Sequence, residues 1–177
     1  MLNGAPGSGK STLAQRYVDE HPPALNVDLD VLRSLVGGWR EDPHTAGLLA
    51  RRSALAMVSG HAGAGHDVVI PQYLGRVEFI EQVERVVGSV GARFVEVVLL
   101  GPKDESRARF EERAGSPDPL HRHAAADVTA AGGAAAFDEM YDALLRVIDA
   151  RPKIRVLPSM AGDVDGAYRS LLAAIDS

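Results

Sequence analysis

The sequence contains no cysteine and no long apolar run, and each absence removes a class of protein. Without cysteine there is no disulfide framework of the kind that small secreted domains use. The longest apolar stretch, residues 95–100, is interrupted by Glu96, whereas a bilayer span needs roughly 18 apolar residues. The first residues also lack the basic and apolar regions of a secretion signal. We therefore expect a cytoplasmic protein with no membrane partner.

The chain has few lysines, and its acidic residues outnumber its basic ones. The chain has 19 Lys and Arg against 24 Asp and Glu, which gives a net charge of -5. Net negative charge disfavours tight binding to a long polyanion, so an oligonucleotide partner stays open but is not favoured. Only Lys10, Lys103 and Lys153 are lysines, so a lysine inside a motif deserves separate examination.

Short apolar segments alternate with helical patterns along the chain. The segments of strand type are residues 1–3, 24–27, 68–70, 94–100 and 154–157. This alternation is typical of an α/β fold with a parallel sheet covered by helices. The turns between the segments are too short for an interdomain linker, so residues 1–177 are expected to form one domain. The Ala- and Gly-rich stretch 124–136 is expected to be helical and to break at Gly132 and Gly133.

The first of these strands is unusually short. Central strands generally have about five residues. Either the sheet extends only through Leu2, or the native start lies upstream of Met1.

A phosphate-binding motif follows the first strand. Residues 4–11 match G-x-x-x-x-G-K-[ST] at every fixed position, between a predicted strand and a predicted helix over residues 11–20. Glycine at these positions lets main-chain N–H groups turn toward phosphate oxygens at the start of a helix. We predict a site for ATP and Mg²⁺, with Lys10 at the β- and γ-phosphates and Ser11 as the metal ligand. The residues expected to bind the nucleotide are Gly4, Ala5, Pro6, Gly7, Ser8, Gly9, Lys10, Ser11 and Thr12.

Two aspartates follow the second strand, at the edge where parallel α/β sheets bind ligands. Asp28 and Asp30 are two residues apart and project to the same side of an extended segment. Asp30 is suited to accept the proton of an attacking hydroxyl, and Asp28 to hold Mg²⁺ waters or to position Asp30. The alternative is that Asp30 only caps the short helix that follows.

Arg33 lies in the first turn of that short helix, where a cation opposes the helix dipole. This unfavourable position has a reason if Arg33 meets an anionic group of the acceptor. The alternative is an ion pair with Asp30 or Glu41.

Residues 4–11 combined with Asn26-x-x-x-Asp30-x-x-Arg33 resemble the phage-type polynucleotide 5'-hydroxyl kinase domain. More broadly they are similar to small P-loop kinases of the AAA_33, zeta-toxin-like and chloramphenicol phosphotransferase-like groups. The resemblance covers roughly residues 1–115. It implies a five-stranded parallel sheet in the order 2-3-1-4-5 with a helical lid over roughly residues 103–130. It also implies that Asp30 is the general base and that Arg33 contacts the phosphate of the acceptor.

The charged segment 101–113 follows the fourth strand and is predicted to form a helix that ends before Gly115 and Pro117. Arg109 and Arg113 are four residues apart and would share a face of that helix. In the resembled kinases, two lid arginines at this spacing close on the phosphates of ATP and stabilise transferred charge. The alternative is a solvated helix in which Glu105 pairs with Arg109 and Arg113 complements the helix C-terminus.

The third strand ends in Gln72, where many members of the resembled group have an aspartate. Mg²⁺ is then expected to be held by Ser11, phosphates and water, with Asp28 or Asp30 acting indirectly. Gln72, Tyr73 and Arg76 are candidate acceptor contacts at the ligand edge.

Three further features have weaker interpretations. Trp39 could stack on an acceptor ring or simply pack. By resemblance only, residues 158–163 occupy the place of an adenine-contacting loop. His121 and His123 make a poor zinc site and are expected in a polar turn beside the lid.

The sequence as a whole predicts an ATP-dependent phosphotransferase that acts on a hydroxyl of a small acceptor, a nucleoside or nucleotide-like molecule being favoured. An antibiotic- or sugar-modifying kinase, a polynucleotide 5'-hydroxyl kinase and a regulatory module that binds nucleotide without transfer remain as alternatives. Either a monomer or a dimer is compatible with the sequence.

Overall fold

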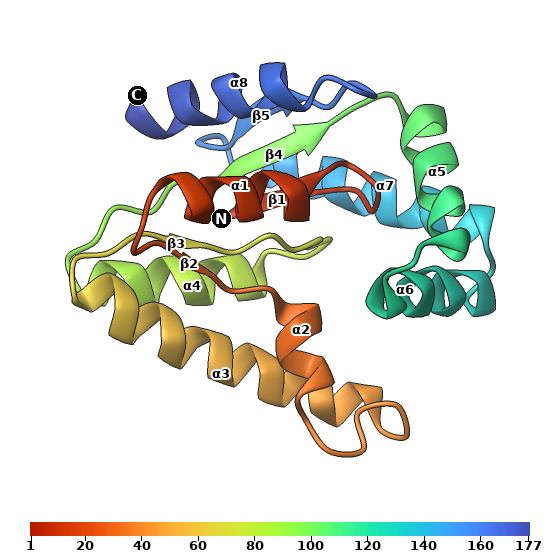
Figure 1. Ribbon diagram of the computed structural model, residues 1–177, viewed down its shortest axis with the longest axis horizontal. Coiled ribbons are helices and arrows are strands. Elements are labelled where there is room, and N and C mark those ends of the chain that lie inside the picture. Colours follow the sequence, from red (N-terminus) through yellow and green to blue (C-terminus); the bar gives the residue numbers. More distant parts are fainter.

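Short parallel strands alternate with helices, as the sequence predicts. The computed structural model describes residues 1–177 apart from the side chain of Arg113. The elements in chain order are β1 (Leu2–Gly4), α1 (Lys10–Glu20), β2 (Leu25–Asn26), α2 (Leu29–Ser34), α3 (Pro43–Gly63), β3 (Val68–Val69), α4 (Glu78–Ser89), β4 (Val97–Leu100), α5 (Lys103–Glu111), the 3-10 turn η1 (Glu112–Gly115), α6 (Pro119–Ala130), α7 (Ala134–Ala150), β5 (Arg155–Pro158) and α8 (Val164–Asp176) (Figure 1).

The strands form two parallel groups, not the one continuous five-stranded sheet that was expected. One group has the order β1-β4-β5 and the other pairs β2 with β3. A bridge between Leu2 and Pro71 connects them. There the Leu2 N–H donates to the carbonyl of Ile70 at 2.9 Å, and the Gln72 N–H donates to the carbonyl of Leu2 at 3.1 Å. The two groups therefore meet along the β1 edge, just before the phosphate-binding motif.

The strands separate toward their amino ends. A cavity of about 450 Å³ opens there, and its lining includes Val68, Val69, Phe94 and Val95. The fourth strand begins at Val97 and not at residue 94, because its ladders start where Val97 pairs with Leu2 and with Arg155. Residues 94–96 continue the apolar sequence segment but belong to no strand in the described part of the chain.

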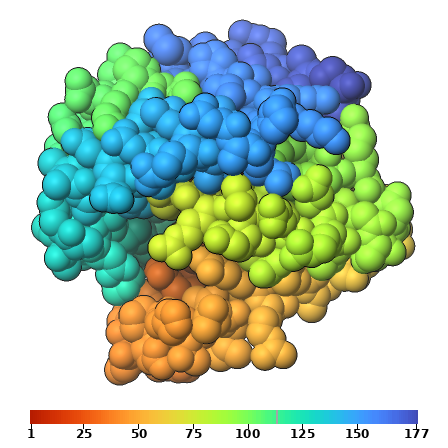
Figure 2. Space-filling model, turned by 180° about the vertical axis from the view of Figure 1, so that it is seen from behind, coloured from red at the N-terminus to blue at the C-terminus, as the bar shows by residue number. Residues whose placement is uncertain are grey.

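Helices cover both faces of the sheet. On one face, α1 and α8 pack on the strands through side chains that include Leu13, Tyr17, Tyr168 and Leu171. The other face is covered by α3, α4 and α7, and Figure 2 shows α7 lying beside α4 on that side of the molecule. Burial of these apolar faces stabilises the fold, because each square ångström removed from water contributes about 25 cal/mol.

The segment predicted as a lid consists of α5, η1 and α6. The Ala- and Gly-rich stretch breaks where the sequence predicts, because Gly132 and Gly133 adopt φ values of 123° and 60° between α6 and α7. None of the described helices is long and apolar enough to cross a membrane.

Candidate active site

The phosphate-binding motif forms a loop between β1 and α1, and close main-chain contacts on two sides require glycine in it. A Cβ atom on Gly4, whose φ is 155°, would lie 2.7 Å from the carbonyl oxygen of Leu99 in β4. A Cβ atom on Gly7, whose φ is 86°, would lie 3.1 Å from the carbonyl oxygen of Ser106 in α5. The loop is therefore fixed against both the sheet and the lid by backbone packing that a larger residue would disturb.

The ammonium group of Lys10 lies inside this loop. Its Nζ donates to the carbonyl oxygens of Gly4 at 2.9 Å and Ala5 at 3.0 Å, and the residue is only 8% exposed. The Ser8 hydroxyl lies 3.5 Å from the same Nζ. The positive charge is thus held at the centre of the loop, where the motif predicts that phosphate oxygens bind.

Asn3 supports the loop from beneath and was not singled out from the sequence. Its side chain is fully buried, and its Oδ1 accepts from the Gly4 N–H at 2.7 Å and from the Leu74 N–H at 2.9 Å. Its Nδ2 donates to the carbonyl of Leu74 at 3.0 Å. A buried amide bonded in this way fixes the loop relative to residues 72–74. An asparagine directly before the motif, at the end of an apolar strand, is the sequence signal that could have revealed it.

Ser11 and Thr12 occupy the first turn of α1. Ser11 is half-buried and Thr12 is exposed. Among the described residues there is no group of three or more His, Asp or Glu side chains that could hold a metal. Mg²⁺ at nucleotide phosphates retains water and takes only one or two protein oxygens, so the predicted site does not require such a group. Ser11 and, through water, Asp28 are the residues that would supply them.

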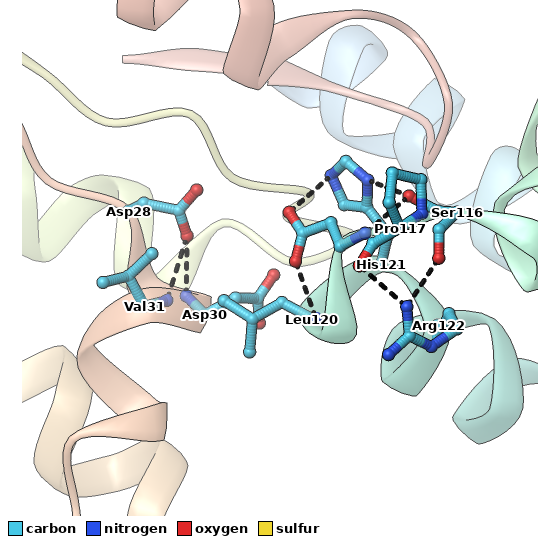
Figure 3. Close-up of polar contacts among 9 residues, drawn as sticks. Asp28, Asp30, Val31, Ser116, Pro117, Leu120, His121 and Arg122 are labelled. Atoms are coloured by element: carbon cyan, nitrogen blue, oxygen red, sulfur yellow. Dashed lines mark hydrogen bonds and ion pairs between the residues drawn. The ribbon is translucent and has the colours of Figure 1, made fainter.

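Asp28, and not Asp30, caps helix α2. One carboxylate oxygen of Asp28 accepts from the main-chain N–H groups of Asp30 at 2.8 Å and Val31 at 3.3 Å. Figure 3 shows its other oxygen turned away from the helix. Burial and the neighbouring charge of Asp30 raise the pKa of the Asp28 carboxyl, whereas the two main-chain N–H groups and Lys10 act in the opposite direction. The interpretation of Asp30 as the cap is therefore wrong, and its carboxylate is not used for capping.

The side chain of Asp30 points out of the first turn of α2. Its Oδ1 lies 3.4 Å from an Arg33 Nη, and the Asp30 side chain is 45% exposed. The ion pair that the sequence left as an alternative for Arg33 is thus present. Arg33 lies in the last turn of α2 and not in the first, so the prediction that its charge opposes the helix dipole is wrong. The guanidinium also lies over the Trp39 ring at 5.4 Å, and its Nε is buried without a hydrogen-bond partner among the described residues. Arg33 has hydrogen-bonding capacity beyond its ion pair.

The first turn of α6 faces α2 across the site, as Figure 3 shows. His121 lies 3.2 Å from the Ser116 hydroxyl and 3.7 Å from the Asp118 carboxylate, and Arg122 donates to the carbonyls of Ser116 and Pro117. These bonds are local, but both histidines lie in helix α6 of the lid and not in the polar turn that was predicted beside it. His123 lies 3.6 Å from the Asp127 carboxylate, and its ring contacts Trp39.

Arg109 lies beside the phosphate-binding loop. Its main chain packs against Gly7, and one Nη donates to the Ser106 hydroxyl and to the carbonyl of Ser159, each at 3.3 Å. The Ser159 hydroxyl in turn donates to the carbonyl of Ser8 at 3.0 Å, so the loop after β5 touches the phosphate-binding loop. A role of this loop in contacting adenine stays a prediction.

Arg113 does not share a helix with Arg109. Helix α5 ends at Glu111, and Arg113 belongs to the 3-10 turn η1, so the expected helix was too long by its last residues. The 3-10 geometry rotates successive residues differently, and the i, i+4 argument does not apply across the junction. The side chain of Arg113 lies outside the described part of the chain.

The three residues that follow β3 are placed differently from one another. Gln72 lies at the ligand edge with its amide oxygen buried and without a hydrogen-bond partner among the described residues. The Tyr73 hydroxyl donates to the carbonyl of Met140 in α7 at 2.9 Å, and its ring packs in the core. Arg76 is exposed. Of these three residues, Gln72 has a side-chain oxygen that can still accept a hydrogen bond, whereas the Tyr73 side chain packs in the core.

One family model matches the greater part of the sequence. The model AAA_33, described as an AAA domain, matches residues 1–133. No curated protein matches the chain.

Several solved structures share the fold, among them two kinases. A gluconokinase from Sinorhizobium meliloti 1021 superposes with a TM-score of 0.63 at 15% identity, covering 99% of this chain and 89% of that one. The APS kinase of Mycobacterium tuberculosis in complex with AMPPNP and APS gives 0.60 at 18% identity, covering 99% and 95%. The tunicamycin resistance protein of Deinococcus radiodurans gives 0.59 at 14% identity, covering 98% and 92%. These identities are low, so the likeness concerns the fold.

Proposed function

The chain belongs to the AAA_33 family of AAA domains, and from this premise we propose that it is an ATP-dependent kinase that phosphorylates a hydroxyl group of a small acceptor. The observation that carries the proposal is that Asp28 and Asp30 follow β2 while the ammonium of Lys10 lies in the loop after β1, so all three lie at the carboxyl edge of the parallel strands. A carboxylate for the acceptor hydroxyl and an ammonium for the phosphates therefore belong to one site.

The proposed reaction transfers the γ-phosphoryl group. The acceptor oxygen forms a bond to the γ-phosphorus, the bond from that phosphorus to the β,γ-bridging oxygen breaks, and the hydroxyl proton passes to Asp30. Asp30 suits this role because its carboxylate is partly exposed and is not used as a helix cap. Lys10 and Arg109 would stabilise the negative charge on the phosphates. Bound Mg²⁺ would supply further charge neutralisation at the phosphates.

The surroundings of Arg33 favour an acceptor that carries an anionic group, such as a nucleotide-like molecule. Its guanidinium is restrained by Asp30 and by the Trp39 ring, while its buried Nε lacks a partner. An acceptor phosphate would satisfy that donor and form charge-assisted hydrogen bonds. Because proteins named gluconokinase and APS kinase share the fold, the fold itself leaves the acceptor open.

The test is transfer of labelled γ-phosphate from Mg-ATP to a panel of nucleosides, 3'-nucleotides, 5'-hydroxyl oligonucleotides, sugars and hydroxylated antibiotics. Asp30→Asn is expected to lower turnover about 10² to 10⁴-fold, the usual contribution of a general base, while nucleotide affinity stays within about twofold. The matched control is Asp19→Asn, because Asp19 is exposed at the end of α1 and bonds to Gln15 in the same helix.

Two results would contradict the proposal. Absence of labelled product across the panel, with Mg-ATP still bound, would favour the regulatory module. Undiminished turnover in Asp30→Asn, with product formed, would keep the kinase and remove Asp30 as its base.

A further inference from the structure

Trp39 is buried within a segment that is otherwise exposed. It lies between α2 and α3 and is only 7% exposed, whereas Gly38, Arg40 and Glu41 around it are all exposed. A large aromatic side chain in a surface loop reaches this degree of burial only when other side chains cover it. The groups that cover Trp39 therefore show what the loop packs against.

The cover comes from two parts of the chain. From its own side, the guanidinium of Arg40 lies 4.4 Å and that of Arg33 lies 5.4 Å from the ring centroid. From α6, the His123 ring meets the indole edge to face, at 4.7 Å between centroids and 75° between planes. Edge-to-face packing at this separation is a favoured aromatic geometry. One indole thus touches both the acceptor-side cation and the lid helix.

We propose that Trp39 is a positioning residue that couples the lid to the acceptor side of the site. Its ring holds the guanidinium of Arg33 in place for the acceptor, and it packs against His123 when α6 lies over α2. Arg33 is then correctly placed only when the lid is in position. The role of Arg33 in this coupling rests on the proposed function, whereas the contact between the lid and the loop does not.

The lid contact is measured by intrinsic fluorescence, because Trp39 is the chain's single tryptophan. His123→Ala uncovers one side of the indole and is expected to shift its emission maximum to longer wavelength. The matched control is His121→Ala, two residues earlier on α6, since His121 contacts Ser116 and Asp118. Its emission should match that of the unaltered protein. Identical emission from His123→Ala and the unaltered protein would overturn the coupling.

The acceptor side is measured by kinetics with whichever acceptor the phosphate-transfer panel identifies. Trp39→Leu is expected to raise the KM for the acceptor about tenfold and to leave the KM for ATP within about twofold. Trp39→Phe, which keeps an aromatic face for the guanidinium, should recover most of the loss. Equal increases in both KM values, or an unchanged acceptor KM, would overturn the positioning role.

The two measurements separate this inference from the proposed function. If no acceptor is phosphorylated, the proposed function fails, but the His123→Ala comparison still decides whether the lid covers Trp39. If phosphate transfer occurs and Trp39→Leu behaves like the unaltered protein, the kinase stands and the coupling fails.

Discussion

The nucleotide side and the acceptor side of the candidate site are built in different ways. On the nucleotide side, the loop over residues 4–11 is held by main-chain contacts, by the buried amide of Asn3 and by the buried ammonium of Lys10. On the acceptor side, the side chain of Arg33 contacts those of Asp30 and Trp39, and the carboxylate of Asp30 is nearly half exposed. The first arrangement is buried and bonded to the backbone, and the second is more exposed and held by side chains alone.

This difference separates phosphate binding from acceptor specificity. Groups bonded to buried backbone keep their positions whichever acceptor is present, which suits the binding of a constant phosphate chain. Exposed side-chain pairs contribute little to stability and can rearrange around different ligands. Acceptor specificity is therefore expected to reside in the loop after α2 and in residues near Gln72.

The largest expected effect comes from comparing Lys10→Ala with Arg33→Ala. Lys10→Ala removes the cation at the centre of the loop and should lower turnover about 10² to 10³-fold while also weakening Mg-ATP binding. Arg33→Ala removes a cation from the acceptor side only. It should raise the acceptor KM about tenfold and leave Mg-ATP affinity within about twofold. Steady-state kinetics and a nucleotide titration measure both changes.

Lys153→Ala is the control for this pair, because Lys153 is exposed and lies beside the amino ends of the strands. Lys153→Ala should leave turnover, Mg-ATP affinity and the acceptor KM unchanged. Weaker Mg-ATP binding in Arg33→Ala would show that the two sides are not independent, and the comparison would then be wrong.

Features set by neighbouring residues are the ones that the sequence could predict. The position of Lys10 beside the carbonyls of Gly4 and Ala5 follows from the pattern of eight contiguous residues. The helix break at Gly132 and Gly133 and the approximate positions of the five strands also follow from local composition. Each of these features is set by residues close together in the chain.

Features that depend on an exact helix boundary or on distant partners were not predictable. The choice between Asp28 and Asp30 as helix cap depends on α2 beginning at Leu29, which residue types alone do not specify. The contact of Trp39 with His123 joins segments 84 positions apart, and no local signal announces it. Tyr73 was expected to meet the acceptor, but its hydroxyl donates to α7 because the core holds its ring there.

A smaller effect is expected from Asp28, which belongs to the acceptor side but is bonded to the backbone. Asp28→Ala removes the cap of α2 and should lower the free energy of unfolding by about 1 kcal/mol. Asn is also a good cap, so Asp28→Asn should keep most of that stability. Denaturant titration of both variants distinguishes loss of the cap from loss of the charge. Equal destabilisation by Ala and Asn would show that the charge, not the cap, stabilises α2.

The pH dependence of Asp28→Asn provides a second check. The pKa of the Asp28 carboxyl is raised in the folded chain, chiefly by burial and then by Asp30, so the folded state binds this proton more tightly than the unfolded state. Its stability contribution is therefore complete below the unfolded pKa and is lost as the pH rises through the folded pKa. Asp28→Asn should gain stability relative to the unaltered protein between pH 4 and pH 7. A difference that shrinks over this interval would contradict the raised pKa.

An effect of similar size tests whether Tyr73 belongs to the site or to the core. Burial raises the pKa of Tyr73 to about 12, so its hydroxyl stays protonated and donates to the carbonyl of Met140 at neutral pH. Tyr73→Phe removes one hydrogen bond and keeps the ring in the core, which should cost about 1 kcal/mol of stability. Because the hydroxyl is directed at α7, the acceptor KM should not change. A rise in that KM with unchanged stability would return Tyr73 to the acceptor side, and would mean that side chains packed against α7 also help to select the acceptor.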